Sequence, residues 1–155
     1  MTTGYLCNSL LTWIIIDMPI EGLSHITLIV SDLSRMERLL TDVLDAKVIY
    51  ASGDKTFSHS PEMFFDIGGV WVAVMQGEAL PSRTYNHIAF KIPEDDFDMY
   101  VARVRNAGVD MKEPRPRVEG EGRSIYFHDH DNHLLELHTG TLSARLLRYA
   151  KGVSP

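Results

Sequence analysis

Residues 117–140, RVEGEGRSIYFHDHDNHLLELHTG, contain the pattern that decides the fold. Two runs, SIYFH and HLLELH, have the composition of β-strands. The DHDN between them holds Asp and Asn, whose side chains bond the local backbone in turns. The segment therefore predicts a β-hairpin. Because side chains alternate across a strand, Leu135 and Leu137 share one face, whereas Leu134, Glu136 and His138 share the other.

Glu136 stands where a half-buried strand normally carries an apolar side chain. Removing a carboxylate from water costs free energy unless the group is paired or bound to a metal. An ordinary solvent-facing glutamate is the alternative, and for a single residue it is the more common case. A functional role for Glu136 therefore depends on partners from other strands.

A strand, a helix and three more strands are predicted at the start of the patterned chain. Residues 23–30, LSHITLIV, alternate as a strand, and Ser31-Asp32 then cap a helix that extends to about Leu44. The runs AKVIYAS, FSHSPEMFFDI and GVWVAVMQG follow as three strands. The predicted order is βαβββ.

The same order starts again after the linker EALPSR. TYNHIAFKI predicts a strand, residues 94–107 a helix that ends at Gly108, VDMKEPRPR another strand, and the hairpin the last two. His25 recurs as His87, 62 positions later, and GVWVAVMQG matches NHLLELHTG, 63 positions later. The tail TLSARLLRYAK predicts a closing amphipathic helix.

These elements predict an α+β fold in one domain, residues 18–151, made of two βαβββ units at about 20–77 and 84–140. Each unit has a four-stranded mixed sheet with its helix on one face, which leaves the opposite face concave. The face under the helices is entirely apolar by parity: Ile26, Leu28, Val30, Val70, Val72, Val74, Ile88, Phe90, Ile92, Ile125, Phe127, Leu135 and Leu137. The concave face holds His25, Thr27, Trp71, Ala73, Met75, His87, Ala89, Ser124, Tyr126, Leu134, Glu136 and His138.

Three residues of the concave face form a candidate metal site: His25, His87 and Glu136. A lone histidine on a strand is more often a core or surface residue, but these two are repeat-equivalent and share their face with a carboxylate. Such a set suits a divalent transition metal and does not select among Mn, Fe, Ni and Zn. His138 is a rival ligand by parity. The remaining histidines are predicted to be solvated: His59, His128, His130 and His133.

Composition limits the class of protein. The chain has 155 residues, enough for one core, and its 45% hydrophobic and 23% charged residues are typical of globular proteins. A net charge of −6 disfavours nucleic acid as a partner. One cysteine, Cys7, excludes an intramolecular disulfide and is consistent with a reducing, cytoplasmic environment.

Residues 1–17 differ from the patterned chain. They lack Lys and Arg, and their apolar run LLTWIII is too short to span a bilayer, so neither a signal peptide nor a membrane anchor is favoured. Met18 directly precedes the first patterned segment. We interpret residues 1–17 as an extension outside the domain, either non-native or from an upstream start. A short amphipathic tail at an oligomer interface is the alternative.

The segments GLSHITLIVSDL, YNHIAFKI, RPRVEGEGRSIYF and DNHLLELHTGTL resemble fosfomycin resistance proteins of the FosX type, in the vicinal oxygen chelate superfamily. The resemblance extends from residue 20 to about residue 150. It implies Mn²⁺-dependent hydrolysis of fosfomycin, with His25, His87 and Glu136 as metal ligands. It also implies a homodimer of paired units in which His25 reaches the partner's metal.

The same resemblance assigns Glu62, in SPEMFF, as the general base. A solvated residue at a strand end is the alternative reading of Glu62. The positions that match the family's substrate-binding residues are Thr27, Tyr85, Ser124, Tyr126 and Arg145. Arg suits a tetrahedral oxyanion because of its planar fork, although Arg145 also fits an exposed helix face. Positive charge nearby comes from Arg115, Arg117 and Arg123.

Two other functions compete with hydrolysis. A thiol transferase of the same superfamily would add a low-molecular-weight thiol to fosfomycin, which Glu62 and the FosX-like flanking sequence disfavour. A drug-sequestering protein of the same fold would need a cavity but no metal, which the complete ligand set disfavours.

Overall fold

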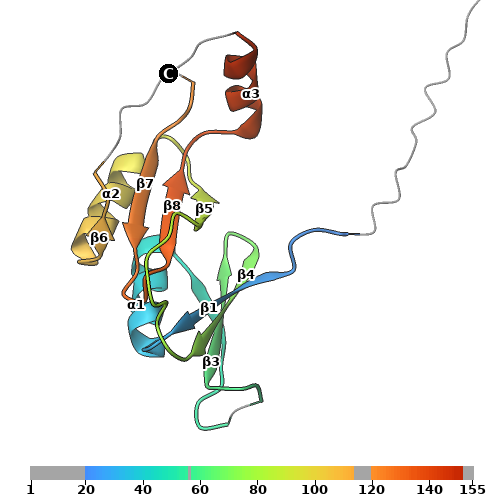
Figure 1. Cartoon of the computed structure of the whole chain (residues 1–155), viewed down its shortest axis with the longest axis vertical. Coiled ribbons are helices and arrows are strands. Elements are labelled where there is room, and N and C mark those ends of the chain that lie inside the picture. Colours follow the sequence, from blue (N-terminus) through green and yellow to red (C-terminus); the bar gives the residue numbers. More distant parts are fainter. Residues whose placement is uncertain (1–19, 56, 114–119, 152–155) are drawn as a thin grey trace, which may run out of the picture.

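Two βαβββ units and a C-terminal helix make up the structure, a computed structural model that describes residues 20–55, 57–113 and 120–151 (Figure 1). The first unit contains β1 (His25–Val30), α1 (Leu33–Leu44), β2 (Lys47–Ala51), β3 (Glu62–Ile67) and β4 (Val70–Gln76). The second contains β5 (His87–Lys91), α2 (Phe97–Asn106), β6 (Asp110–Met111), β7 (Ser124–His128) and β8 (Leu134–His138), and α3 (Leu142–Ala150) follows. The predicted α+β fold is confirmed. The N-terminal extension, which contains Cys7, lies outside the described residues, as do Arg115 and Arg117.

Each unit forms one four-stranded mixed sheet with the same strand order. The first sheet runs β1-β4-β3-β2 and the second β5-β8-β7-β6. The first strand of each unit pairs in parallel with the last, and the other pairings are antiparallel. The internal repeat seen in the sequence is therefore a repeat of topology, and it places His25 and His87 at equivalent positions.

Helix α1 follows the predicted capping. The Asp32 carboxylate accepts a hydrogen bond from the Arg35 amide at 2.9 Å, and the helix ends at Asp45, which adopts a positive φ of 52°. Helix α2 is shorter than predicted: it begins at Phe97 rather than at residue 94. Residues 94–96 form a turn instead, in which the Phe97 amide donates to the Glu94 carbonyl at 3.2 Å.

Two strands are also shorter than predicted. The run from residue 57 becomes strand only at Glu62, after Pro61, which has no amide hydrogen for a β-ladder. The run from residue 109 pairs with β7 only at Asp110–Met111, and residues 114–119 are not among the described residues. The hairpin turn has the predicted chemistry, because the Asp129 carboxylate accepts from the amides of Asp131 (2.9 Å) and His133 (2.8 Å).

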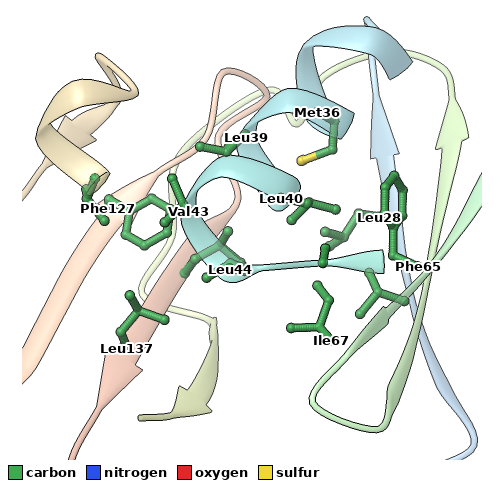
Figure 2. Close-up of a cluster of buried hydrophobic side chains, with 14 of the residues drawn as sticks. Leu28, Met36, Leu39, Leu40, Val43, Leu44, Phe65, Ile67, Phe127 and Leu137 are labelled. Atoms are coloured by element: carbon green, nitrogen blue, oxygen red, sulfur yellow. The ribbon is translucent and has the colours of Figure 1, made fainter. Parts of the chain in front are cut away.

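One hydrophobic core extends through both units. Leu40, Val43 and Leu44 of α1 belong to the same cluster as Phe65 of the first sheet and Phe127 of the second (Figure 2). The side chains predicted by parity to lie under the helices all belong to this core or pack against it. The opposite faces of both sheets are thus left for function.

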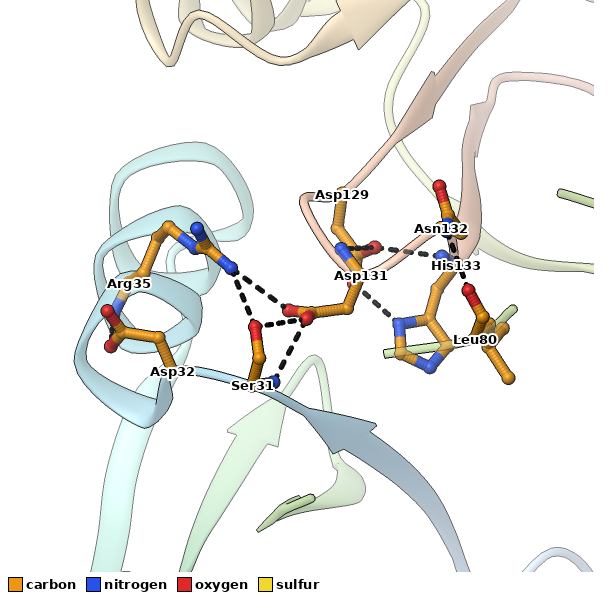
Figure 3. A network of polar contacts seen from close by, with 8 residues as sticks. All are labelled: Ser31, Asp32, Arg35, Leu80, Asp129, Asp131, Asn132 and His133. Atoms are coloured by element: carbon orange, nitrogen blue, oxygen red, sulfur yellow. Dashed lines mark hydrogen bonds and ion pairs between the residues drawn. The ribbon is translucent and has the colours of Figure 1, made fainter. Parts of the chain in front are cut away.

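Asp131 in the β7–β8 turn joins the two units. Its Oδ1 accepts hydrogen bonds from the Ser31 amide (2.9 Å) and hydroxyl (2.5 Å), and Arg35 lies 3.6 Å from its Oδ2 (Figure 3). Next to it, the Asn132 amide group donates to the Leu80 carbonyl at 2.7 Å. The turn of the second unit is therefore bound both to the start of α1 and to the linker.

Over the described residues, no helix has the length and apolar character needed to cross a bilayer.

Candidate metal and substrate site

The concave face of the second sheet brings together most of the predicted site residues. Across three neighbouring strands the register aligns Ala89 of β5, Glu136 of β8 and Tyr126 of β7. The next row aligns His138 with Ser124. Glu136 is only 5% exposed, so its carboxylate needs partners inside the protein.

His87 is the first partner of Glu136. The Nε2 atom of His87 lies 3.0 Å from Oε2 of Glu136, and Nδ1 of His87 lies 2.8 Å from the Tyr85 carbonyl oxygen. Because a carbonyl only accepts, Nδ1 carries a hydrogen, and in the neutral imidazole Nε2 then presents a lone pair to the carboxylate. Two electron-rich atoms that face each other in this way require a cation between them or a proton on Nε2.

Ser124 holds the other oxygen of Glu136. The Ser124 hydroxyl is 2.5 Å from Oε1 of Glu136 and 2.8 Å from Nδ1 of His138. The hydroxyl has one proton, which it donates to the carboxylate, so it accepts a hydrogen bond from His138. The hydrogen bond of His138 therefore goes to Ser124, and its Nδ1 lies farther, at 3.6 Å, from Oε1 of Glu136.

Tyr126 and Tyr85 form an aromatic wall beside this pair. The Tyr126 ring lies 5.5 Å from the His87 ring and 6.2 Å from the Tyr85 ring, measured between centroids. Burial, followed by hydrogen bonding to Tyr85 and Glu136, raises the pKa of Tyr126 to about 12. Tyr126 therefore keeps its phenolic proton at neutral pH and can donate it to an anion.

A cavity of about 450 Å³ opens over these groups. The residues that line it include Tyr85, His87, Tyr126, Glu136, His138 and Arg145. Arg145 comes from α3, whose N-cap Thr141 accepts a hydrogen bond from the Ala144 amide at 3.1 Å. The cavity thus combines an imidazole, a carboxylate, phenols and a guanidinium, and can accommodate a small anion next to a metal.

His25, Thr27 and Glu62 lie on the concave face of the other sheet. His25 is exposed and packs against Trp71, with ring centroids 4.5 Å apart. Glu62 is 8% exposed and pairs with Met75, whereas His25 pairs with Trp71, four residues earlier on β4. The single chain does not bring His25 to His87 and Glu136, and the described residues contain no group of three or more His, Cys, Asp or Glu able to hold a metal ion.

The donor set of the second sheet fits a divalent transition metal. Imidazole nitrogen and carboxylate oxygen are ligands of such ions, and His87 is oriented by a carbonyl and Glu136 by a hydroxyl, as ligand side chains commonly are. Two ligands leave the coordination incomplete within one chain.

Two histidine predictions are wrong. His128 is only 4% exposed, and burial, followed by the charges of Arg83 and Lys112, lowers its pKa. His133 is bound through Nδ1 to Asp129 at 2.6 Å, in the turn that joins the units. The sequence showed only their place near a turn, whereas their burial comes from packing against distant segments. His59 and His130 are exposed, as predicted.

The sequence left the contacts of Arg123 open and assigned no role to Arg148. The Arg123 guanidinium lies over the Phe97 ring at 3.7 Å and binds Asp98 at 2.7 Å. Both partners are in α2, and Arg123 does not line the cavity. Arg148 is 6% exposed and forms an ion pair with Glu121. The amphipathic pattern of α3 did not distinguish this buried cation from a surface charge.

The fold and the imidazole–carboxylate pair are those expected of a metalloenzyme built from βαβββ units. A family model, that of the Glyoxalase/Bleomycin resistance protein/Dioxygenase superfamily, matches residues 22–137, and the chain belongs to this superfamily.

Within the superfamily the chain is similar to fosfomycin resistance proteins named FosX. It is 64% identical over 134 residues to FosX of Mesorhizobium japonicum, covering 86% of this chain and 96% of that protein. It is 57% identical to FosX of Listeria monocytogenes, covering 84% and 98%. The structure of a Listeria monocytogenes FosX mutant complexed with Mn(II) and 1S,2S-dihydroxypropylphosphonic acid matches with a TM-score of 0.76 at 54% identity, over 84% of this chain and 98% of that one.

Proposed function

We propose that this protein is a Mn²⁺-dependent hydrolase that opens the oxirane ring of fosfomycin and so inactivates the antibiotic. The observation that carries the proposal is the pair His87–Glu136, 3.0 Å apart in a cavity that also contains Arg145. Similarity to FosX supports it, because the FosX structure described above holds Mn(II) together with a dihydroxypropylphosphonic acid. A vicinal diol is the product of adding water to an oxirane.

The metal ligands in this proposal are His87 and Glu136 of one subunit with His25 of the partner subunit. Bound there, Mn²⁺ supplies a Lewis acid that stabilises negative charge developing on oxygen. Fosfomycin contributes a phosphonate, for which the chain offers the Arg145 guanidinium and the Tyr126 phenol. Tyr85, Ser124 and Thr27 complete the proposed substrate-binding set, with Ser124 acting through its hydrogen bond to Glu136.

Glu62 is the proposed general base. Its carboxylate is largely removed from solvent, and its place on the concave face leaves it directed away from the core. It takes one proton from water while the water oxygen bonds to an oxirane carbon and the C–O bond on that carbon breaks. A proton returns to the released oxygen, so the sum of the reaction is the addition of one water.

A homodimer follows from the division of these groups between two sheets. His25 and Thr27 are exposed on one concave face, and His87 and Tyr85 on the other. Pairing the first sheet of one copy with the second sheet of another covers both faces and completes each site. We place this dimer in the cytoplasm, in keeping with the low cysteine content.

Mixing two inactive variants tests the shared site. In a dimer of His25→Ala and Glu136→Ala chains, one site has lost both ligands and the other has kept both. Random reassociation makes about half of the dimers mixed, so about a quarter of the parent activity should return. If each chain used its own His25, the mixture would stay inactive.

The product of the reaction tests the function itself. Protein, Mn²⁺ and fosfomycin are incubated with and without glutathione, and the product mass is measured. Addition of water in both mixtures is the expected result. Addition of the thiol would identify a transferase, and recovery of unchanged fosfomycin from a tight complex would identify a drug-sequestering protein.

A further inference from the structure

Helix α3 is attached to the domain mainly by a charged side chain. Of Leu142–Ala150, all of which the structure describes, Arg148 is the one buried residue. Its large apolar side chains are exposed: Leu142, Leu146, Leu147 and Tyr149. Hydrophobic burial therefore contributes little to the position of α3. Among the described residues, α3 is held by the ion pair of the Arg148 guanidinium with the Glu121 carboxylate, which is itself only 17% exposed.

Glu121 is next to a segment that contacts the connection between β8 and α3. The neighbouring Arg123 amide donates to the Thr139 hydroxyl at 2.8 Å, and the Thr139 amide donates to the Arg123 carbonyl at 3.0 Å. A Cβ atom on Gly122 would lie 2.4 Å from the amide nitrogen of Gly140, so the two backbones are in direct contact. The loop is thereby fixed to the segment that joins β8 to α3.

Arg145 lies three residues before Arg148 and therefore on the same side of α3. It lines the cavity with His87 and Glu136. Among the described residues, no carboxylate lies within ion-pair distance of Arg145, whereas Arg148 is paired with Glu121. One arginine of the helix is thus an anchor, and the other presents its charge to the cavity.

We propose that Glu121 and Arg148 are positioning residues that hold α3 against the cavity and so place Arg145 for the anionic group of the substrate. The inference rests on the proposed function for the identity of that anion, a phosphonate. Removing Arg148 breaks its ion pair with Glu121 and so weakens the attachment of α3, so the helix shifts and Arg145 loses its fixed place. Misplacement of a binding group by about 1 Å can cost as much as ~100-fold.

The test compares Arg148→Met, Glu121→Gln, Arg145→Met and the double variant Arg145→Met/Arg148→Met. Two readouts need no turnover: the dissociation constant of inorganic phosphate for the Mn²⁺-loaded protein, and amide hydrogen exchange of residues 141–151. Arg148→Met should weaken phosphate binding about ten- to a hundredfold and speed exchange in α3. Glu121→Gln, which keeps a hydrogen-bond acceptor, should do the same to a smaller extent. For fosfomycin, KM should rise by a similar factor while kcat changes little.

Non-additivity separates positioning from general destabilisation. If Arg148 acts through Arg145, the double variant binds phosphate no more weakly than Arg145→Met alone. Arg103→Met is the matched control, because it breaks the exposed Arg103–Asp45 pair between α2 and α1, away from the cavity, and should leave phosphate binding unchanged. Parent-like phosphate binding in Arg148→Met, or additive losses in the double variant, would overturn the proposal. Because phosphate binding and exchange are measured without catalysis, a parent protein that fails to hydrolyse fosfomycin would overturn the proposed function alone.

Discussion

The two concave faces have the same backbone and different chemistry. Thr27, Ala73 and Phe64 align across the first sheet as Ala89, Glu136 and Tyr126 align across the second. One row further, Glu62 of β3 stands where the second unit has Ser124 of β7. In the second unit the carboxylate, Glu136, is therefore on the last strand, β8. In the first unit the carboxylate, Glu62, is on the strand before the last, β3.

The different positions of Glu136 and Glu62 suit the different roles proposed for them. In the second sheet Glu136 lies against His87 and is held by Ser124, as suits a metal ligand. In the first sheet the position equivalent to Glu136 is Ala73, so His25 has no same-sheet carboxylate of that kind and Glu62 lies away from it. In the proposed function, the two copies of the unit thus differ in role: one sheet binds the metal and the other contributes the base.

The largest effect is expected from Glu136→Ala, which removes the carboxylate of the metal-binding sheet. The variant should lose Mn²⁺ affinity by more than about a hundredfold, because loss of a ligand exceeds the effect of losing one of its supporting groups. Metal content after dialysis measures this directly. His138→Ala is the matched control and should retain metal, since Nδ1 of His138 is hydrogen-bonded to Ser124 at 2.8 Å and lies 3.6 Å from Oε1 of Glu136. Full metal retention in Glu136→Ala would show that the sheet does not provide the site.

Glu62→Gln tests the other sheet. Gln preserves size and hydrogen bonding but cannot accept the proton, so hydrolysis should fall by about 10²- to 10⁴-fold while Mn²⁺ and fosfomycin binding persist. Steady-state rates at saturating metal provide the measurement. Asp66→Asn, on the same face of β3, is the control and should stay within a few-fold of the parent. A Gln variant with nearly the parent rate would mean that Glu62 is not the base.

The sequence was sufficient for the fold because the repeat is periodic. Alternation along β1, β4, β5, β7 and β8 placed each side chain on the correct face, and the spacing between His25 and His87 marked two equivalent strands. Alternation identifies a face but not a distance. It placed His25 and Glu136 on the concave faces of two different units, as the structure does, but could not give the distance between them.

The alternation of side chains along a strand or helix could not predict burial that comes from contacts between distant segments. His128 was predicted to be solvated but is buried, and Arg148, to which the sequence assigned no role, is buried in an ion pair with Glu121. The same holds for Asp131, which looks like an ordinary turn residue but binds Ser31, 100 positions away. Polar residues buried by tertiary contacts carry no local period that could reveal them.

Ser124→Ala tests how the metal-binding sheet orients its ligand. Without the hydroxyl, Oε1 of Glu136 loses its 2.5 Å donor and the link to His138. Mn²⁺ affinity should fall about 10- to 100-fold, as for other groups that orient a metal ligand. Titration of metal-free protein with Mn²⁺ gives the affinity, and Ser143→Ala, exposed on α3, should leave it unchanged. An unaltered affinity would show that Glu136 is oriented without Ser124.

Asp131 determines how firmly the two units are joined. Burial alone would raise its pKa, but hydrogen bonds from the Ser31 hydroxyl and amide, with the charges of Arg35 and His133, outweigh burial and lower it. A pKa lowered in the folded state stabilises the protein above the unfolded value of about 3.9, and this stability is lost as the pH falls through the folded pKa.

Asp131→Asn should therefore lower the free energy of unfolding by about 1–2 kcal/mol at neutral pH, since a charged acceptor is replaced by a neutral one. Urea unfolding of metal-free protein at pH 7 and at pH 3 measures the difference from the parent. The difference should shrink at pH 3, which lies below the unfolded pKa of about 3.9, because the unfolded chain of the parent has then bound the proton. Asp42→Asn, exposed on α1, should show little difference at either pH. A loss equally large at both pH values would mean that Asp131 joins the units by its shape rather than by its charge, and the Ser31–Asp131 contact would then behave as a neutral hydrogen bond.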